Sequence, residues 1–153
     1  MKYMMLVCRD ESVELSPEER AQIGPATEAW VQAAIAACHA TAADAADTDW
    51  AEIAALYSEL ARLVPSPVVE LNRAVAVAMA DGPAAGLGLV RALEESGALT
   101  GYHLLPATRA DLLLRLGRRA EAAAGFAEAL DLAATDAERR FLTRRLAEAA
   151  APE

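Results

Sequence analysis

The chain has 153 residues and a formal net charge of −9. It is long enough for one domain with a real core and too short for two domains of ordinary size. Hydrophobic residues make up 55% of the sequence and aromatic residues only 5%, an excess of Ala, Leu and Val that favours close-packed helices.

The negative charge repels a phosphate backbone and argues against direct nucleic-acid binding. No apolar run reaches the roughly 18 residues of a membrane span. The two cysteines form no CxxC pattern, which predicts a reducing, cytoplasmic setting.

The first segment, "KYMMLVC" at Lys2–Cys8, is a short apolar run that ends abruptly at "RDES". A run this short predicts a strand buried on both faces. A helix start follows at "LSPEER", with Ser16 as the expected N-cap and Pro17 in the first turn.

From "ATEAWVQAAIAACHA" onward the whole chain is predicted to be helical. "DTDWAEIAALYSELARL" forms one helix, with Thr48 or Asp49 as its cap, and "VPSPVV" ends it and starts the next, which runs to about Ala80. Further helices are expected at about Ala84–Glu95, Tyr102–Leu116, Arg119–Leu132 and Asp136–Ala149. The links between them are short, which predicts antiparallel neighbours.

An internal repeat is visible in the second half of the chain. "AGLGLVRALEE" from Ala85 aligns with "AAAGFAEALDL" from Ala122 at an offset of 37 residues, which pairs Gly88 with Gly125. The stretch "LGRRAEAAAGFAEALDL" looks like the second helix of a tetratricopeptide repeat, whose small residues let paired helices approach closely. The expected architecture is therefore all-α: about three antiparallel helical hairpins in a right-handed, tetratricopeptide-like solenoid.

The apolar stretch "PSPVVELNRAVAVA" carries an Asn-Arg pair in its middle. Helical periodicity places Asn72 beside Val75 and Met79 on an apolar face, while Arg73 points away and can pair with Glu70. Asn72 is therefore the candidate buried polar residue of this helix.

Arg109 is likewise a polar residue on the apolar face of a later helix, where it lies among leucines such as Leu105. On the same helix Asp111 and Arg115 are expected to form an ordinary i,i+4 pair on a solvated face. A buried amide or guanidinium without a partner costs roughly 1–3 kcal/mol or more. One reading satisfies Asn72 and Arg109 with carbonyls at a helix end or loop. A second has them line a concave groove that holds a peptide or small anion, and a third gives them a catalytic role.

The histidines offer little chemistry. Cys38 and His39 are adjacent in a helix and diverge by about 100°, so they cannot chelate one ion unaided. His103 stands next to Tyr102 near a helix start and is expected at a surface or boundary. No catalytic, metal-binding or cofactor-binding motif is present. The candidate residues for a groove or a buried polar site are Asn72, Arg73, Tyr102, His103 and Arg109.

From about Gln32 to the C-terminus, roughly four-fifths of the chain resembles the C-terminal helical-repeat extension of certain bacterial extracytoplasmic-function sigma factors. The segments that carry this resemblance are "QAAIAACHA", "DTDWAEIAALYSEL", "PSPVVELNRAVAVA", "DGPAAGL", "GYHLLPATRADLLLRLGR", "AEAAAGFAEAL" and "AERRFLTRRL". In that family the extension follows the DNA-reading and polymerase-binding domains and tunes sigma activity through protein contacts. No basic recognition helix precedes Gln32, so promoter binding is not expected to carry over.

Residues 1–31, "MKYMMLVCRDES…LSPEE…IGPATEAWV", are similar to the opening strand and helix of YCII-related (DGPF-motif) proteins, which are small ferredoxin-like dimers. The rest of that sheet is absent, so no active site of that family is expected. The expected organisation is a YCII-like fragment at 1–31 joined to a helical-repeat domain at 32–153. A lone strand leaves backbone groups unpaired. It is therefore expected to pair with the same strand of a second subunit, in a homodimer, through the residues Tyr3, Met4, Met5, Leu6 and Val7.

The leading interpretation is a non-enzymatic interaction module in transcription regulation, without cofactor. Its protein partner would be a sigma factor or RNA polymerase, and its acidic surface would suit a basic partner surface. The alternative is a small-molecule-binding or enzymatic YCII-like protein, with a pocket at the dimer seam lined by Tyr3, Arg9 and His39. A third interpretation is a non-functional remnant of recombination.

Overall fold

The structure is a computed structural model that describes residues 29, 31–38 and 48–151. These residues form helices and short turns, and no strand occurs among them. The prediction of an all-α fold is therefore confirmed for this part of the chain. The expected strand at Tyr3–Val7 and the helix start at Ser16 lie outside the described residues.

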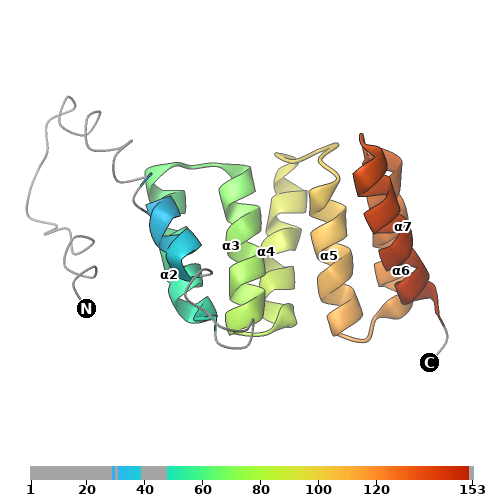
Figure 1. The fold of residues 1–153 in the computed structure, drawn as a ribbon, viewed down its shortest axis with the longest axis horizontal. Coiled ribbons are helices and arrows are strands. Elements are labelled where there is room, and N and C mark those ends of the chain that lie inside the picture. Colours follow the sequence, from blue (N-terminus) through green and yellow to red (C-terminus); the bar gives the residue numbers. More distant parts are fainter. Residues whose placement is uncertain (1–28, 30, 39–47, 152–153) are drawn as a thin grey trace, which may run out of the picture.

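The helices match the segments predicted from the sequence. A helical stretch at 31–38, blue in Figure 1, precedes the labelled helices. These are α2 (Trp50–Leu63), α3 (Pro67–Ala80), α4 (Pro83–Ser96), α5 (Leu104–Arg115), α6 (Arg119–Leu132) and α7 (Asp136–Ala150). The largest difference is that α5 begins two residues later than expected, because a turn containing the positive-φ residues Gly97 and Gly101 precedes it.

Local chemistry explains where the helices begin. The Asp49 side chain accepts a hydrogen bond of 3.0 Å from the backbone N–H of Glu52 and caps α2. Pro67 and Pro83 occupy the first turn of α3 and α4, where a missing N–H costs nothing. Gly82 links those two helices with a φ of 100°, a backbone conformation that favours glycine.

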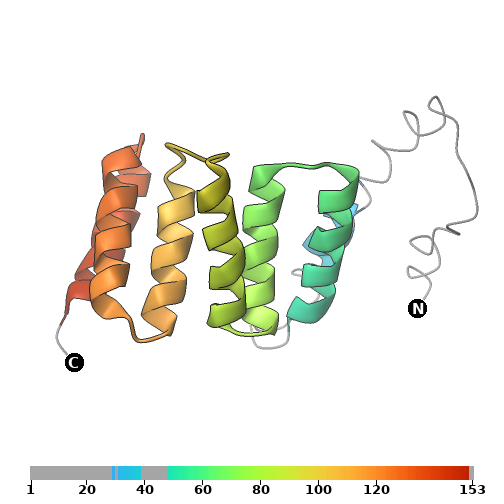
Figure 2. The same cartoon turned by 180° about the vertical axis from the view of Figure 1, so that it is seen from behind.

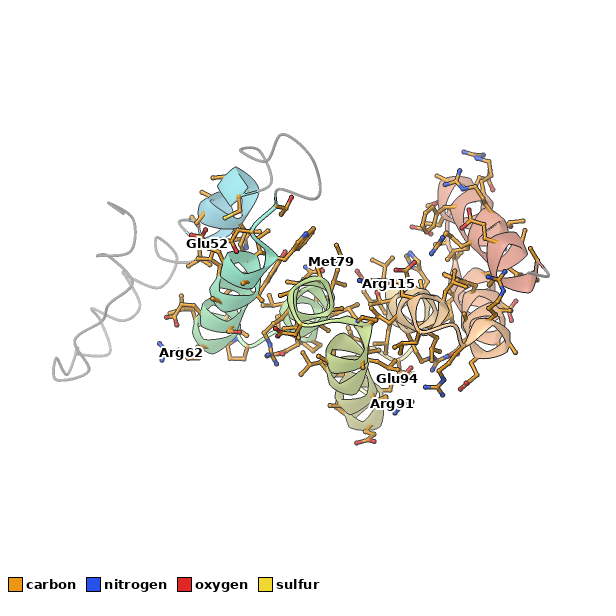
Figure 3. The ribbon with its side chains drawn as sticks, turned by 90° about the horizontal axis from the view of Figure 1, so that it is seen from below. Glu52, Arg62, Met79, Arg91, Glu94 and Arg115 are labelled. Carbon is orange, nitrogen blue, oxygen red and sulfur yellow. The ribbon has the colours of Figure 1, made fainter. Side chains whose placement is uncertain are left out.

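The helices pack in series, each against the next one in the chain. Figure 1 shows neighbouring helices running antiparallel, with connections alternating between the two ends, and Figure 2 shows the same order from behind. Seen along the helices in Figure 3, the array is curved. Met79 and Arg115 lie on the side toward which the array curves, which we call the inner side, and Arg91 and Glu94 lie on the opposite side.

The buried side chains form two clusters that share helix α3. The smaller cluster joins the stretch 31–38 to α2 and α3 through Val31, Ile35, Ile53, Leu60 and Ala76. The larger one extends from α3 to α7 and includes Phe126, which is 1% exposed.

Glycines set the closest approaches between helices. A Cβ built on Gly86 of α4 would lie 2.4 Å from the Ala78 Cβ and 2.6 Å from the Ala74 carbonyl oxygen. A Cβ on Gly125 of α6 would lie 3.0 Å from the Ala110 Cβ. Gly88 has open space around it.

The expected repeat register, which paired Gly88 with Gly125, is therefore wrong by two residues. The buried positions Gly86, Leu87 and Val90 of α4 correspond to Gly125, Phe126 and Ala129 of α6. Sequence similarity paired Gly88 with Gly125 because the residues around them are alike. In the structure Gly86 is the equivalent of Gly125, because each of these two glycines touches the preceding helix.

Candidate protein-interaction face

Asn72 is exposed on α3, so the interpretation in which it is a buried amide is wrong. It shares a stripe with Val68, Val75 and Met79, which are 40%, 39% and 40% exposed. Ala76 belongs to the smaller cluster, and the face of α3 toward α4 carries Leu71, Ala74 and Ala78. Close contact with Gly86 requires small side chains on that face, and this turns the larger ones outward.

The other half of the pair behaves as predicted. The Arg73 Nε donates a 2.8 Å hydrogen bond to a carboxylate oxygen of Glu70, one turn back on the same helix. Arg73 is therefore occupied by a local ion pair at the edge of α3.

Arg109 joins three helices. Its guanidinium forms ion pairs with Glu94 of α4 and Glu128 of α6, so its acceptors are carboxylates rather than helix-end or loop carbonyls. Its partner Glu94 lies on the side of the array opposite Met79 (Figure 3). Asn72 and Arg109 therefore line no common groove, and that prediction is wrong as well.

Tyr102 and His103 lie at the start of α5. Tyr102 is half-buried against the larger core cluster, and its ring centroid is 5.7 Å from that of His103. The His103 Nε2 is 3.8 Å from a carboxylate oxygen of Glu138 on α7. His103 is partly buried, as expected for a boundary position, and Tyr102 packs against the core rather than lining a groove with Asn72.

The expected pair between Asp111 and Arg115 is also absent. Asp111 forms an ion pair with Arg145 of α7, which in turn pairs with Glu148. Arg115 reaches back to α3, where its guanidinium lies 3.4 Å from the Met79 sulfur and 3.5 Å from the Ala78 carbonyl oxygen.

These contacts define a surface that we call the inner face. Helical periodicity places four residues of α3 on the stripe that ends at Met79 and four residues of α5 on the stripe that ends at Arg115. The inner face consists of Val68, Asn72, Val75 and Met79 of α3 and of Leu104, Thr108, Asp111 and Arg115 of α5. Its apolar members are each about two-fifths exposed, including Leu104 at 43%.

The inner face could have been found in the sequence. Its two stripes have the same spacing of four, three and four residues and are separated by a constant offset of 36 positions, from Val68 to Leu104 and from Met79 to Arg115. What the spacing does not reveal is which side of each helix faces the core.

Cys38 does not have the surroundings of a reactive thiol. Burial raises the pKa of the Cys38 thiol, and the nearby carboxylates of Glu52 and Asp49 raise it further. Its expected neighbour His39, like Tyr3 and Arg9 of the alternative pocket, lies outside the described residues. Among the residues that are described, no group of three His, Cys, Asp or Glu side chains could hold a metal ion, and no helix is long and apolar enough to cross a membrane.

Comparison with known proteins finds a relative in a bacterium. The chain is 47% identical over 116 residues to a protein of Rhizobium meliloti (strain 1021) that is described as uncharacterized. The match covers 76% of this chain and 27% of the relative, so the chain spans about a quarter of that protein's length. No family model matches the chain, and no solved structure matches it.

Proposed function

We propose that the protein is a non-enzymatic interaction module that modulates transcription through protein contacts, related to the regulatory extension of extracytoplasmic-function sigma factors. In this proposal the antiparallel helices form a right-handed, tetratricopeptide-like solenoid that works in the cytoplasm, and a sigma factor or RNA polymerase is the partner. The observation that carries the proposal is the inner face, where apolar side chains of α3 and α5 remain exposed.

The inner face supports binding because four of its eight residues are exposed apolar side chains. Val68, Val75 and Met79 follow one another along three turns of α3, and Leu104 begins the neighbouring stripe on α5. Single exposed apolar residues are normal on protein surfaces, whereas a row of them marks a place where another molecule docks.

The extent of the match supports a modular role. The Rhizobium protein contains this sequence pattern as about a quarter of a longer chain. A helical array with its own core can be attached to other domains without changing its packing.

The proposal is tested by a binding experiment with purified sigma factor and RNA polymerase from the same cell. We expect micromolar binding of the native chain and at least a tenfold loss in Val75→Asp, which places a charge on the inner face. Ala92→Asp is the matched control, because Ala92 is an exposed residue of α4. The proposal fails if neither partner binds at micromolar concentrations, or if both variants weaken binding equally.

We also propose that the protein forms a homodimer through its N-terminal strand, Tyr3–Val7. Removal of residues 1–10 should then leave a folded monomer in sedimentation velocity. A dimer that survives this truncation rules the strand out as the contact.

A further inference from the structure

We propose that the inner face binds an amphipathic helix of the partner protein, one that carries an apolar stripe and a carboxylate that pairs with Arg115. This inference rests on the proposed function and specifies the segment that is recognised. Its evidence is the geometry, the order of side chains and the charge of the inner face.

The geometry suits a helix. α3 and α5 contact each other directly, and the contacts of Arg115 with Met79 and Ala78 bring together the C-terminal ends of both helices. α3 and α5 run in the same direction (Figure 1), so each stripe extends from this contact for three turns, or about 16 Å. Side chains at this helical spacing form a path of ridges along which a third helix can pack.

The order of side chains along this path is uneven. The end at Val68 and Leu104 is apolar on both helices, and the side chains of Asn72 and Thr108 come next. The exposed Asn72 amide makes no hydrogen bond within the described part of the chain. A bound helix would have to offer it a polar partner, and a single such amide within an apolar seam fixes the register of a helix pair.

The charge at the other end identifies the partner's chemistry. Asp111 pairs with Arg145 of α7, which it shares with Glu148. Arg115 forms no ion pair with any carboxylate of the described residues. Of the two charged residues of the inner face, Arg115 is thus the one without a carboxylate partner among the described residues, in a chain whose formal net charge is −9. A guanidinium beside apolar surface pairs best with a carboxylate, and a cation at this point of the partner would be repelled.

The test uses three synthetic helical peptides of about 18 residues. The acidic peptide has leucines at the spacing of the inner face and a glutamate at each end of that stripe, so that either orientation places a carboxylate at Arg115. The basic peptide replaces both glutamates with lysine, and the third replaces the leucines with serine. Fluorescence anisotropy at low salt measures the binding of each peptide to the native chain and to Arg115→Glu, Val75→Asp and Arg91→Glu.

We expect the native chain to prefer the acidic over the basic peptide by about three- to fivefold, which is the size of one partly exposed ion pair. Arg115→Glu should reverse this preference, Val75→Asp should weaken both peptides, and Arg91→Glu, which changes the opposite side of the array, should leave the preference unchanged. The serine peptide should not bind. Circular dichroism melting checks that each variant folds.

The inference is overturned if acidic and basic peptides bind equally, if Arg115→Glu keeps the native preference, or if no leucine peptide binds at millimolar concentration. It is also overturned if sedimentation shows a dimer of the native chain that Val75→Asp abolishes, because the inner face would then be occupied by a second copy. None of these results depends on binding to sigma factor or polymerase, so a failure here is distinguishable from a failure of the proposed function.

Discussion

At the scale of single residues, Gly86 and Gly88 lie on the same helix and have opposite surroundings. Gly86 is buried against Ala74 and Ala78 of α3, and Gly88 is exposed with no atom within 4 Å of an added Cβ. The intrinsic helix preference of alanine over glycine is about 1 kcal/mol at either position. Only the tertiary contact distinguishes them.

We therefore expect Gly86→Ala to destabilise the protein and Gly88→Ala to stabilise it. The Cβ of Gly86→Ala would meet a backbone oxygen at 2.6 Å, so α4 must move away from α3. Overpacking of this kind costs about 1–3 kcal/mol, more than the gain in helix preference. Gly88→Ala should increase the free energy of unfolding by up to about 1 kcal/mol. Urea denaturation measures both, and equal effects of the two substitutions would contradict the close approach of α3 and α4.

The same contact explains why the orientation of α3 could not be predicted from its sequence. Both faces of this helix are apolar, and Val75 and Met79 have the larger side chains, so hydrophobicity favoured them as the core. The core face is chosen by fit, because α4 presents Gly86 and leaves room only for Ala74 and Ala78. Information about that fit lies in another helix and is not local to the stretch around Asn72.

At the scale of helices, Arg109 connects α5 to both α4 and α6 through Glu94 and Glu128. Replacement of Arg109 with leucine removes both ion pairs and leaves Glu94 and Glu128 without the cation that they share. We expect the free energy of unfolding to fall by about 1 kcal/mol, since the side chains involved are partly exposed.

The control for Arg109 is Arg62→Leu, which breaks a pair with Glu59 within α2, where the arginine side chain is 62% exposed. Its effect should stay below about 0.5 kcal/mol. The loss in Arg109→Leu should shrink in high salt, because salt screens exposed charges. A loss as small as that of Arg62→Leu would show that Arg109 does not tie the three helices together.

The start of α7 makes stability depend on pH. Glu138 accepts hydrogen bonds from the backbone N–H groups of Thr135 at 3.0 Å and Ala134 at 2.9 Å. The bond from Thr135, more than that from Ala134 and the nearby His103, lowers the pKa of Glu138 below its ordinary value of 4.5. Because the folded pKa is lower than the unfolded one, this cap stabilises the protein above about pH 4.5 and loses that effect as the pH falls through the folded pKa.

We expect Glu138→Gln to flatten this dependence. The glutamine amide can still accept a backbone hydrogen bond but cannot titrate. The melting temperature of the variant should therefore fall less than that of the native chain between about pH 5 and pH 3. The exposed Glu95 of α4 provides the control, and Glu95→Gln should follow the native profile. A profile for Glu138→Gln that overlies the native one would show that the hydrogen bonds accepted by Glu138 do not contribute to acid stability.

The ends of the helices could be predicted because their signals are local. The Asp49 side chain caps the first turn of α2. Pro67 fixes the backbone at the start of α3, and Gly82 allows the positive φ between α3 and α4. The pairing of Arg73 with Glu70 was predictable for the same reason. The partners of Arg109, Asp111 and Arg115 lie on other helices, and their identity depends on how the whole array packs.

At the scale of the whole molecule, α3 is the helix that contributes residues to both buried clusters of the described part of the chain. Each helix packs mainly against its neighbours in the chain, so the effect of a core substitution should spread along the array and weaken with distance. Phe126 in α6 and Ile53 in α2 are fully buried in different clusters and test this.

We expect Phe126→Leu to cost about 1–2 kcal/mol and Ile53→Val about 1 kcal/mol, because both leave a small cavity. In native-state hydrogen exchange, Phe126→Leu should accelerate exchange most in α5, α6 and α7, while Ile53→Val should act most on 31–38, α2 and α3. Both substitutions should reach α3, since residues of this helix belong to both clusters. A uniform increase in exchange from 31 to 150 in either variant would mean that the array unfolds as one cooperative unit. In that case a destabilising substitution in α5 would also open α3, so the two halves of the inner face could not be perturbed separately.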